Sequence, residues 1–240
     1  MPIVAIFALV DAYPQPAEYH LFADTRKLFG IPNFWNVVSN ALFLVFGFAG
    51  LILLRANARL AILSRLKPAC YVLFFGILLT AFGSTWFHLA PNNDTLFWDR
   101  LPMTIAFMPL FTLIYGENVS ARWARRLLWP LILVGTASVI YWDYTESIGS
   151  GDLRLYGLVQ FLPLLLIPFM LLTYPSAFST TRFYWLAIAL YGFAKVFEQL
   201  DGQIYALSGI ISGHSLKHVT ASLVPLVLIK GFRTRRLVNR

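Results

Sequence analysis

Residues 68–89 read PACYVLFFGILLTAFGSTWFHL, a stretch without Asp, Glu, Lys or Arg that has a histidine next to its end. A helix needs about 20 apolar residues to cross the hydrocarbon core of a bilayer, so this stretch is long enough to be a membrane span. Lys67 precedes it, and the polar segment 91–94, PNND, follows it. The stretch therefore predicts a transmembrane helix that carries His88 near one of its ends.

Six further apolar runs have a similar length. They cover residues 34–54, 96–116, 124–142, 154–173, 182–201 and 214–231, with a loop expected over 202–213. Hydrophobic residues make up 58% of the 240-residue chain and charged residues only 12%, against about 25% in soluble domains. We therefore predict an all-α, polytopic membrane protein. Its seven-helix transmembrane domain covers 34–231, after an external or interfacial segment (1–33) and before a basic tail (232–240).

Basic residues set the expected orientation of the bundle. Most of the 19 Lys and Arg residues lie in alternate loops and in the tail: Arg55, Arg59, Arg65, Lys67, Arg122, Arg125, Arg126, Arg182, Lys230, Arg233, Arg235, Arg236 and Arg240. Lys and Arg collect on the cytoplasmic side of membrane proteins. This bias predicts an external N-terminus and a cytoplasmic C-terminus, in the cell (inner) membrane. It also accounts for the net charge of +8 without a nucleic-acid partner.

Polar side chains inside the predicted spans gather at the external ends of five helices. They are Asn36, Ser39, Asn40, Ser84, His88, Asp99, Glu198, Asp201, His214, Lys217 and His218. Polar groups are costly within a bilayer and usually serve a function there. Their common level predicts one polar site at the external face of the bundle.

Three of the four histidines belong to this group. His214 and His218 are four residues apart, so they share a helix face, and His88 comes from another span. Catalytic zinc commonly takes three protein ligands and one water, and the single Cys70 excludes a cysteine-based site. We therefore expect Zn²⁺ at these histidines. Asp99 would act as general base or acid, and Ser84 would donate a hydrogen bond to a developing oxyanion.

Structural interpretations of the same residues stay open. A histidine pair at this spacing also occurs without metal, and Asp99 with Arg100 fits a charge at a helix start with a snorkelling partner. Lys195 and Glu198, three residues apart, fit a structural ion pair. The tryptophans near the predicted external ends fit an interfacial aromatic belt; they are Trp35, Trp86, Trp98 and Trp142.

Three blocks of sequence resemble the alkaline ceramidase-like family of the CREST superfamily of seven-span membrane hydrolases. They are FWNVVSN at 34–40, GSTWFH at 83–88 with WDRLPM at 98–103, and GHSLKH at 213–218. The resemblance implies a zinc amidase that hydrolyses ceramide to a sphingoid base and a fatty acid. It places zinc on His88, His214 and His218, with Ser84 and Asp99 assisting. The stretches 19–24 and 212–218 are similar to prokaryotic members.

Two positions depart from the family pattern. Animal members have an acidic N-terminal stretch that binds calcium, whereas this chain keeps only Asp24 and Asn33 there, so we do not expect a calcium site. The family often has an acid after the site aspartate, where this chain has Arg100. Two other classes of function stay open: a lipid-binding receptor or scaffold with a structural metal, and a proton-coupled transporter using Lys195, Glu198 and Asp201. The sequence does not indicate an oligomeric state.

Overall fold

Helices account for nearly all regular structure in the computed structural model, which describes residues 2–56 and 59–238. Within these residues the only β-type pairings are two isolated bridges, so the predicted all-α class is confirmed. The helices are α1 (Pro2–Leu9), η1 (Ala17–His20), α2 (Phe34–Val38), α3 (Ala41–Arg55), η2 (Ser64–Leu66), α4 (Lys67–Leu89), α5 (Asn93–Tyr115), η3 (Gly116–Ser120), α6 (Ala121–Ser147), α7 (Arg154–Thr173), α8 (Arg182–Gln199), α9 (Asp201–Ser208) and α10 (Gly213–Thr234).

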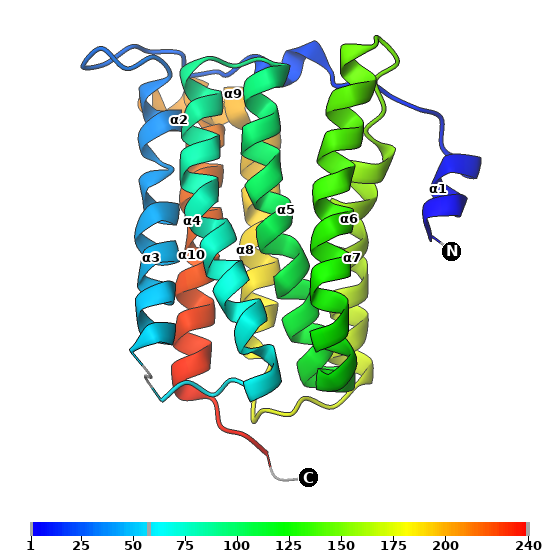
Figure 1. Ribbon diagram of the computed structural model, residues 1–240. Coiled ribbons are helices and arrows are strands. Elements are labelled where there is room, and N and C mark those ends of the chain that lie inside the picture. Colours follow the sequence, from blue (N-terminus) through cyan, green and yellow to red (C-terminus); the bar gives the residue numbers. More distant parts are fainter. Residues whose placement is uncertain (1, 57–58, 239–240) are drawn as a thin grey trace.

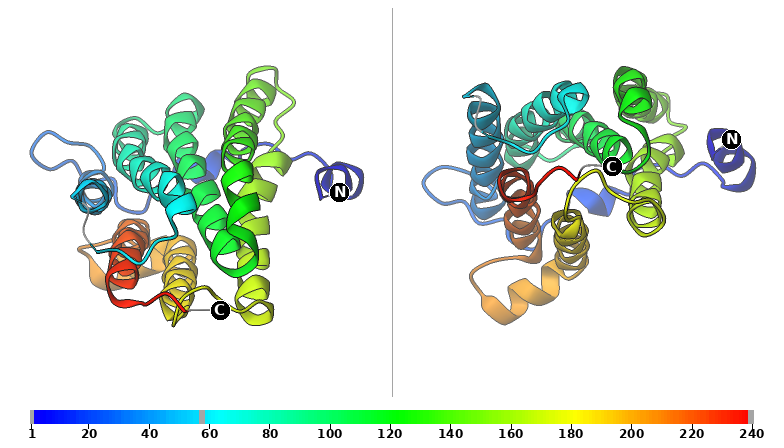
Figure 2. Two further views of the ribbon diagram at one scale, coloured as in Figure 1. Left: turned by 60° about the horizontal axis from the view of Figure 1, so that its bottom comes forward. Right: turned by 90° about the horizontal axis from the view of Figure 1, so that it is seen from below.

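The long helices run up and down in one bundle (Figure 1). Helices α4, α6 and α8 end at the upper end of Figure 1, where α5, α7 and α10 begin. Seen along the bundle, α8 and α10 lie together on one side and α6 lies on the other (Figure 2). The prediction of a loop over 202–213 was wrong for most of this segment, because residues 201–208 form the helix α9 across the upper end of the bundle.

Five segments of the described chain have the length and apolar composition of membrane spans. They are Phe34–Arg55, Ser64–Leu89, Asn93–Ser147, Arg154–Thr173 and Gly213–Thr234. The helices also expose large apolar side chains, among them Phe48, Leu133, Leu165 and Leu172. Such side chains facing outward suit a lipid environment better than water, so the fold supports a membrane protein.

Glycines let neighbouring helices approach closely near the upper end. A Cβ added at Gly83 of α4 would lie 1.9 Å from the backbone oxygen of Trp98 in α5. A Cβ added at Gly213 would lie 2.1 Å from the backbone oxygen of Phe197 in α8. No side chain fits at either position. Each glycine precedes a residue of the predicted polar site, Ser84 or His214, and therefore sets how close that residue comes to the neighbouring helix.

A buried ion pair joins distant segments at the lower end. The guanidinium of Arg235 donates hydrogen bonds to both carboxylate oxygens of Glu117, at 2.5 and 2.7 Å, and to the backbone oxygen of Ala61. The hydroxyl of Tyr184 donates to the same Glu117 carboxylate at 2.7 Å. Arg235 was counted in the basic tail, yet its side chain is only 3% exposed. It follows α10 directly and folds back onto the bundle.

Candidate active site

Three histidines from two helices meet inside the upper end of the bundle. His88 lies in the last turn of α4, and His214 and His218 lie in the first two turns of α10. All three are at least 95% buried, and each offers a ring nitrogen such that these atoms all lie within 4.8 Å of one another. The predicted convergence of the three side chains is confirmed, and the cluster is one that could bind a metal ion.

The ring nitrogens themselves fit a cation. The Nε2 atoms of His88 and His218 face each other at 3.2 Å. In the described part of the chain, Nε2 of His214 and Nδ1 of His88 have no hydrogen-bond partner. Buried polar atoms are normally satisfied, so unsatisfied ring nitrogens on histidines of one cluster indicate a group that binds there. Three neutral imidazoles are a donor set that zinc favours.

Ser39 orients the ring of His218. Its hydroxyl lies 2.9 Å from Nδ1 of His218 and donates to the backbone oxygen of Asn36 at 3.1 Å. A hydroxyl has one proton, so with that proton on Asn36 the oxygen accepts from Nδ1–H of His218. The Nε2 lone pair of His218 is then directed at the cluster. This is the arrangement that second-layer groups commonly impose on metal-binding histidines.

The backbone around the histidines is held by polar side chains from the other predicted positions. Asn36 accepts from the hydroxyl of Ser215 at 2.6 Å, and Asp201 accepts from the backbone N–H of His214 at 2.7 Å. Asn40 is buried at the same level and donates to the backbone of Asn36 at 2.9 Å. These residues therefore hold the backbone that carries the histidines.

Ser84 and Asp99 lie next to each other across the close contact of α4 and α5. The hydroxyl of Ser84 lies near the carboxyl of Asp99, and both residues are more than 90% buried. Both line the same cavity as His218. A buried carboxyl and a hydroxyl beside a possible metal centre are the groups expected for proton transfer and oxyanion stabilisation.

A cluster of charges borders the site on the α8 side. Glu198 accepts from Lys195 at 2.5 Å and from Lys217 at 3.0 Å, which confirms the predicted pair of Lys195 and Glu198. The charge on Glu198 is therefore shared between a lysine of its own helix and one of α10. This pairing gives α8 and α10 a polar contact at the level of the histidines.

The site opens into a long apolar cavity of about 370 Å³. Its wall includes Asp99 at the upper end of α5 and Ile114 near the lower end, a separation of about 22 Å at 1.5 Å per residue. The lower lining comes from apolar side chains of α5, α7, α8 and α10, including Leu110, Leu164, Ile188 and Leu228. Such a cavity, polar at one end and apolar along its length, fits an amphiphilic molecule.

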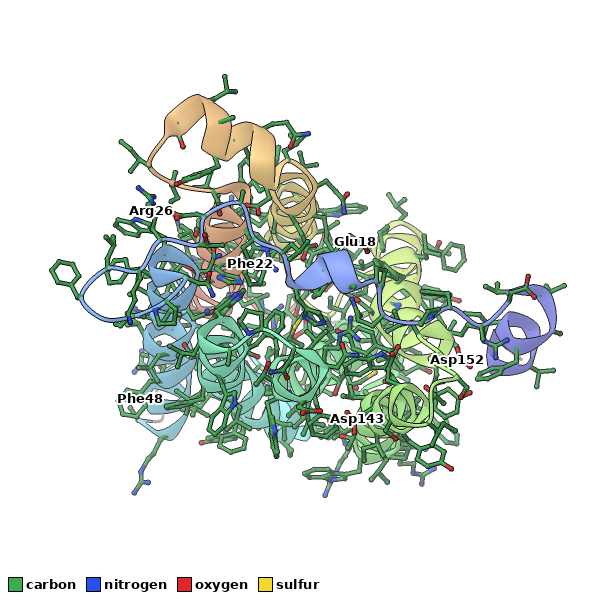
Figure 3. The ribbon with its side chains drawn as sticks, turned by 90° about the horizontal axis from the view of Figure 1, so that it is seen from above. Glu18, Phe22, Arg26, Phe48, Asp143 and Asp152 are labelled. Carbon is green, nitrogen blue, oxygen red and sulfur yellow. The ribbon has the colours of Figure 1, made fainter. Side chains whose placement is uncertain are left out.

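The N-terminal segment covers the upper end of this cavity. Figure 3 shows η1 and Phe22 crossing the middle of the bundle when it is seen from above. The ring centroid of Phe22 lies 4.7 Å from that of His88 and 4.6 Å from that of His214. The backbone N–H of Ala23 donates to Asp201 at 2.9 Å, which ties the segment to α9. The sequence pattern does not reveal this cover, because the contacts link residues far apart in the chain.

Three other polar residues of this segment, His20, Arg26 and Asn33, have partners outside the histidine rings. Nε2 of His20 lies 2.9 Å from the side-chain oxygen of Asn93, away from the other histidines. Arg26 pairs with Asp24 at 2.7 Å, and the side chain of Asn33 donates to the backbone oxygen of His88 at 2.8 Å. Burial raises the pKa of Asp24, but the hydrogen bonds from Arg26 lower it, and the net shift is downward.

Two structural interpretations that the sequence left open do not hold for Trp142 and Arg100. Trp142 is fully buried, not interfacial, while Trp86 and Trp98 are exposed. Arg100 does not snorkel to the surface, because it is 5% exposed and its guanidinium lies 4.2 Å from the Trp142 ring.

Comparison with known proteins adds the family. A family model described as Ceramidase matches residues 29–188, which include Ser84, His88 and Asp99. No curated protein matched the chain. Residues 29–188 are two thirds of the 240-residue chain. The protein therefore belongs to the ceramidase family.

Proposed function

We propose that this protein is a zinc-dependent, membrane-embedded amidase that cleaves a ceramide-like lipid into a sphingoid base and a fatty acid. Family membership supports ceramide hydrolysis in general. The observation that carries the proposal is the cluster of His88, His214 and His218, of which His218 lines the polar end of an apolar cavity together with Ser84 and Asp99. A lipid amide fits this cavity with its acyl chain along the apolar wall and its carbonyl at the histidine end.

His88, His214 and His218 would hold the zinc. When bound, zinc would supply a Lewis acid and lower the pKa of a bound water toward neutrality. Hydrogen bonds keep two of these histidines in position, because Ser39 fixes the ring of His218 and Asp201 fixes the backbone at His214. Phe22 covers two of the rings and limits the access of bulk water.

Asp99 and Ser84 would perform the proton transfer and charge stabilisation. Asp99 takes a proton from the attacking water and passes it to the amide nitrogen as the carbon–nitrogen bond breaks. The hydroxyl of Ser84 donates to the carbonyl oxygen as negative charge develops there. The products are a fatty acid and an amine. Removing one such oxyanion donor typically lowers kcat by about 10²–10³.

The membrane topology of the proposal has seven crossings. Residues 93–147 would be about 82 Å long as one straight helix, far more than the roughly 30 Å hydrocarbon core. Instead the chain reverses at η3, so α5 and α6 run side by side as two crossings (Figure 1). Helix α8 completes the seven, although Arg182, Lys195 and Glu198 reduce its hydropathy.

The basic lower end would face the cytoplasm, with the site toward the external face of the cell membrane. We keep 1–33 as the external cover, whereas the hydrolase bundle, placed at 34–231 from the sequence, extends to the end of α10 at Thr234, and Arg235 of the expected tail (232–240) packs against it. The natural Cys70 is fully buried, so introduced cysteines can be labelled selectively. A membrane-impermeant maleimide should label Ser150→Cys in whole cells but label Ser179→Cys only after lysis. The reverse pattern would contradict the orientation.

Metal and activity measurements test the chemistry. Purified wild type should contain about one zinc per chain and hydrolyse ceramide, whereas His214→Ala should lose both. His20→Ala is the matched control, because it removes a histidine that lies outside the cluster and should keep the zinc. Asp99→Asn should retain zinc and lose hydrolysis. If Asp99→Asn hydrolyses ceramide as fast as wild type, a receptor or scaffold with a structural metal is the better description.

A further inference from the structure

Arg100 is a buried cation without a carboxylate partner. It is 5% exposed, and it takes part in none of the ion pairs found among residues 2–56 and 59–238. Its NH2 group donates to the side-chain oxygen of Gln15. Its NH1 group has no hydrogen-bond partner in the same described residues. A buried charge is normally paired, because the loss of hydration is otherwise uncompensated.

Aromatic rings surround the guanidinium on three sides. It lies 4.2 Å from the centroid of Trp142, 4.6 Å from that of Tyr156 and 5.6 Å from that of Tyr19. Cation–π contacts of this kind stabilise a guanidinium, but they accept no hydrogen bond from its N–H groups in the plane. The rings therefore hold Arg100 in one place while the donors of NH1 stay available to a ligand.

The location of Arg100 connects it to the proposed reaction. Successive residues of an α-helix point about 100° apart, so Asp99 faces α4 while Arg100 faces α6 and α7. Both residues nevertheless line the one cavity that contains Ser84 and His218. A group bound at NH1 would be part of the same molecule whose amide lies at Ser84 and Asp99.

The charges on the cavity wall also favour an anion. The charged lining residues are Asp99, Arg100, Lys195, Glu198 and Lys217. Glu198 is shared by the two lysines, and Asp99 is beside Ser84. The wall thus has more cationic than carboxylate side chains, and Arg100 is the one that no acid contacts directly among the described residues. A ligand with a negative charge would balance this excess.

We propose that Arg100 binds a carboxylate of the lipid ligand. This inference rests on the proposed function and extends its substrates from ceramide to acyl amides whose amine half carries a carboxylate; in the other arrangement Arg100 binds the carboxylate of the fatty-acid product. The planar fork of a guanidinium matches the two oxygens of a carboxylate.

A matched pair of substrates tests the inference. N-dodecanoylglycine and N-dodecanoylethanolamine have the same acyl chain and amide, but only the first has a carboxylate. Wild type should show a kcat/KM at least about tenfold higher for the glycine amide, as expected for a charge-assisted hydrogen bond. Arg100→Met should abolish this ratio. Arg126→Met is the control, because Arg126 is an exposed arginine stacked on Trp123, and it should leave the ratio unchanged.

Equilibrium binding to Asp99→Asn, which has the Arg100 side chain but should not hydrolyse the amides, covers the case in which Arg100→Met does not fold. The ligands are N-dodecanoylglycine, dodecanoate and N-dodecanoylethanolamine. Tighter binding of the glycine amide than of the other two assigns the carboxylate to the substrate, and tighter binding of dodecanoate assigns it to the product. Equal affinity for all three overturns the inference. If carboxylates bind preferentially but wild type hydrolyses no amide, the proposed function fails and the carboxylate site stands.

Discussion

Replacing Gly83 with alanine would separate the two helices that hold Ser84 and Asp99. The added Cβ would lie 1.9 Å from the backbone oxygen of Trp98, whereas real Cβ atoms essentially never come closer than 3.0 Å. Helices α4 and α5 must therefore move apart by about 1.1 Å at this point. Displacing a catalytic group by about 1 Å can reduce activity about 10²-fold. Forcing extra volume into a packed contact typically costs about 1–3 kcal/mol.

The assay for Gly83→Ala is kcat/KM for ceramide, measured together with the unfolding temperature in detergent. Gly192→Ala is the matched control, because a Cβ at that position of α8 meets no atom within 4 Å. We expect Gly192→Ala to be as active and at least as stable as wild type, since alanine favours a helix more than glycine does. Wild-type kcat/KM and stability in Gly83→Ala would refute the reasoning, because the helices would then not depend on this close contact.

Three further changes probe other parts of the structure. The side-chain hydrogen bonds from Arg154 hold the pKa of Asp152 at about 2, below about 3.9 in an unfolded chain. The stabilisation of the fold by ionised Asp152 is thus complete above about pH 4 and is lost as the pH falls through about 2. The unfolding temperatures of wild type and Asp152→Asn should therefore converge over that range. A difference that stays constant with pH would contradict this. Arg235→Met leaves Glu117 buried without its cation and should lower the free energy of unfolding by about 3–5 kcal/mol in a denaturant titration. Adding Glu117→Gln to the same chain should restore part of this stability. An unchanged free energy of unfolding in Arg235→Met would mean that the pair is dispensable. Ser39→Ala should lower zinc affinity about 10–100-fold in competition with a chelator, and an unchanged affinity would remove Ser39 from the site.

The sequence was sufficient for the features that follow a local period. Long apolar runs predicted the helices, and the four-residue spacing of His214 and His218 predicted one shared face. Alternation of helix direction then placed His88 at the same level, where the structure has it. Lys195 and Glu198 were also predicted to pair from their spacing alone. Each of these predictions needs only neighbours along one helix and the order of the helices.

Features that depend on distant parts of the chain were not predicted. Phe22 covers the histidines through contacts with helices that follow much later in the sequence. Trp142 was placed at an interface because its position near a helix end is typical of a belt, but packing around Arg100 buries it. Helix α9 was missed, because residues 201–208 are too few and too weakly patterned to be distinguished from a loop.

The ion pair at the lower end has a consequence for biosynthesis. Glu117 and Arg235 are 118 positions apart, so the carboxylate is made long before its partner. Until Arg235 leaves the ribosome, the turn between α5 and α6 contains an acid that the finished fold buries almost completely. Insertion of the earlier helices must therefore proceed with that turn still hydrated. Helix α10 and Arg235 then close it, so this end of the bundle is sealed only after Arg235 has been added.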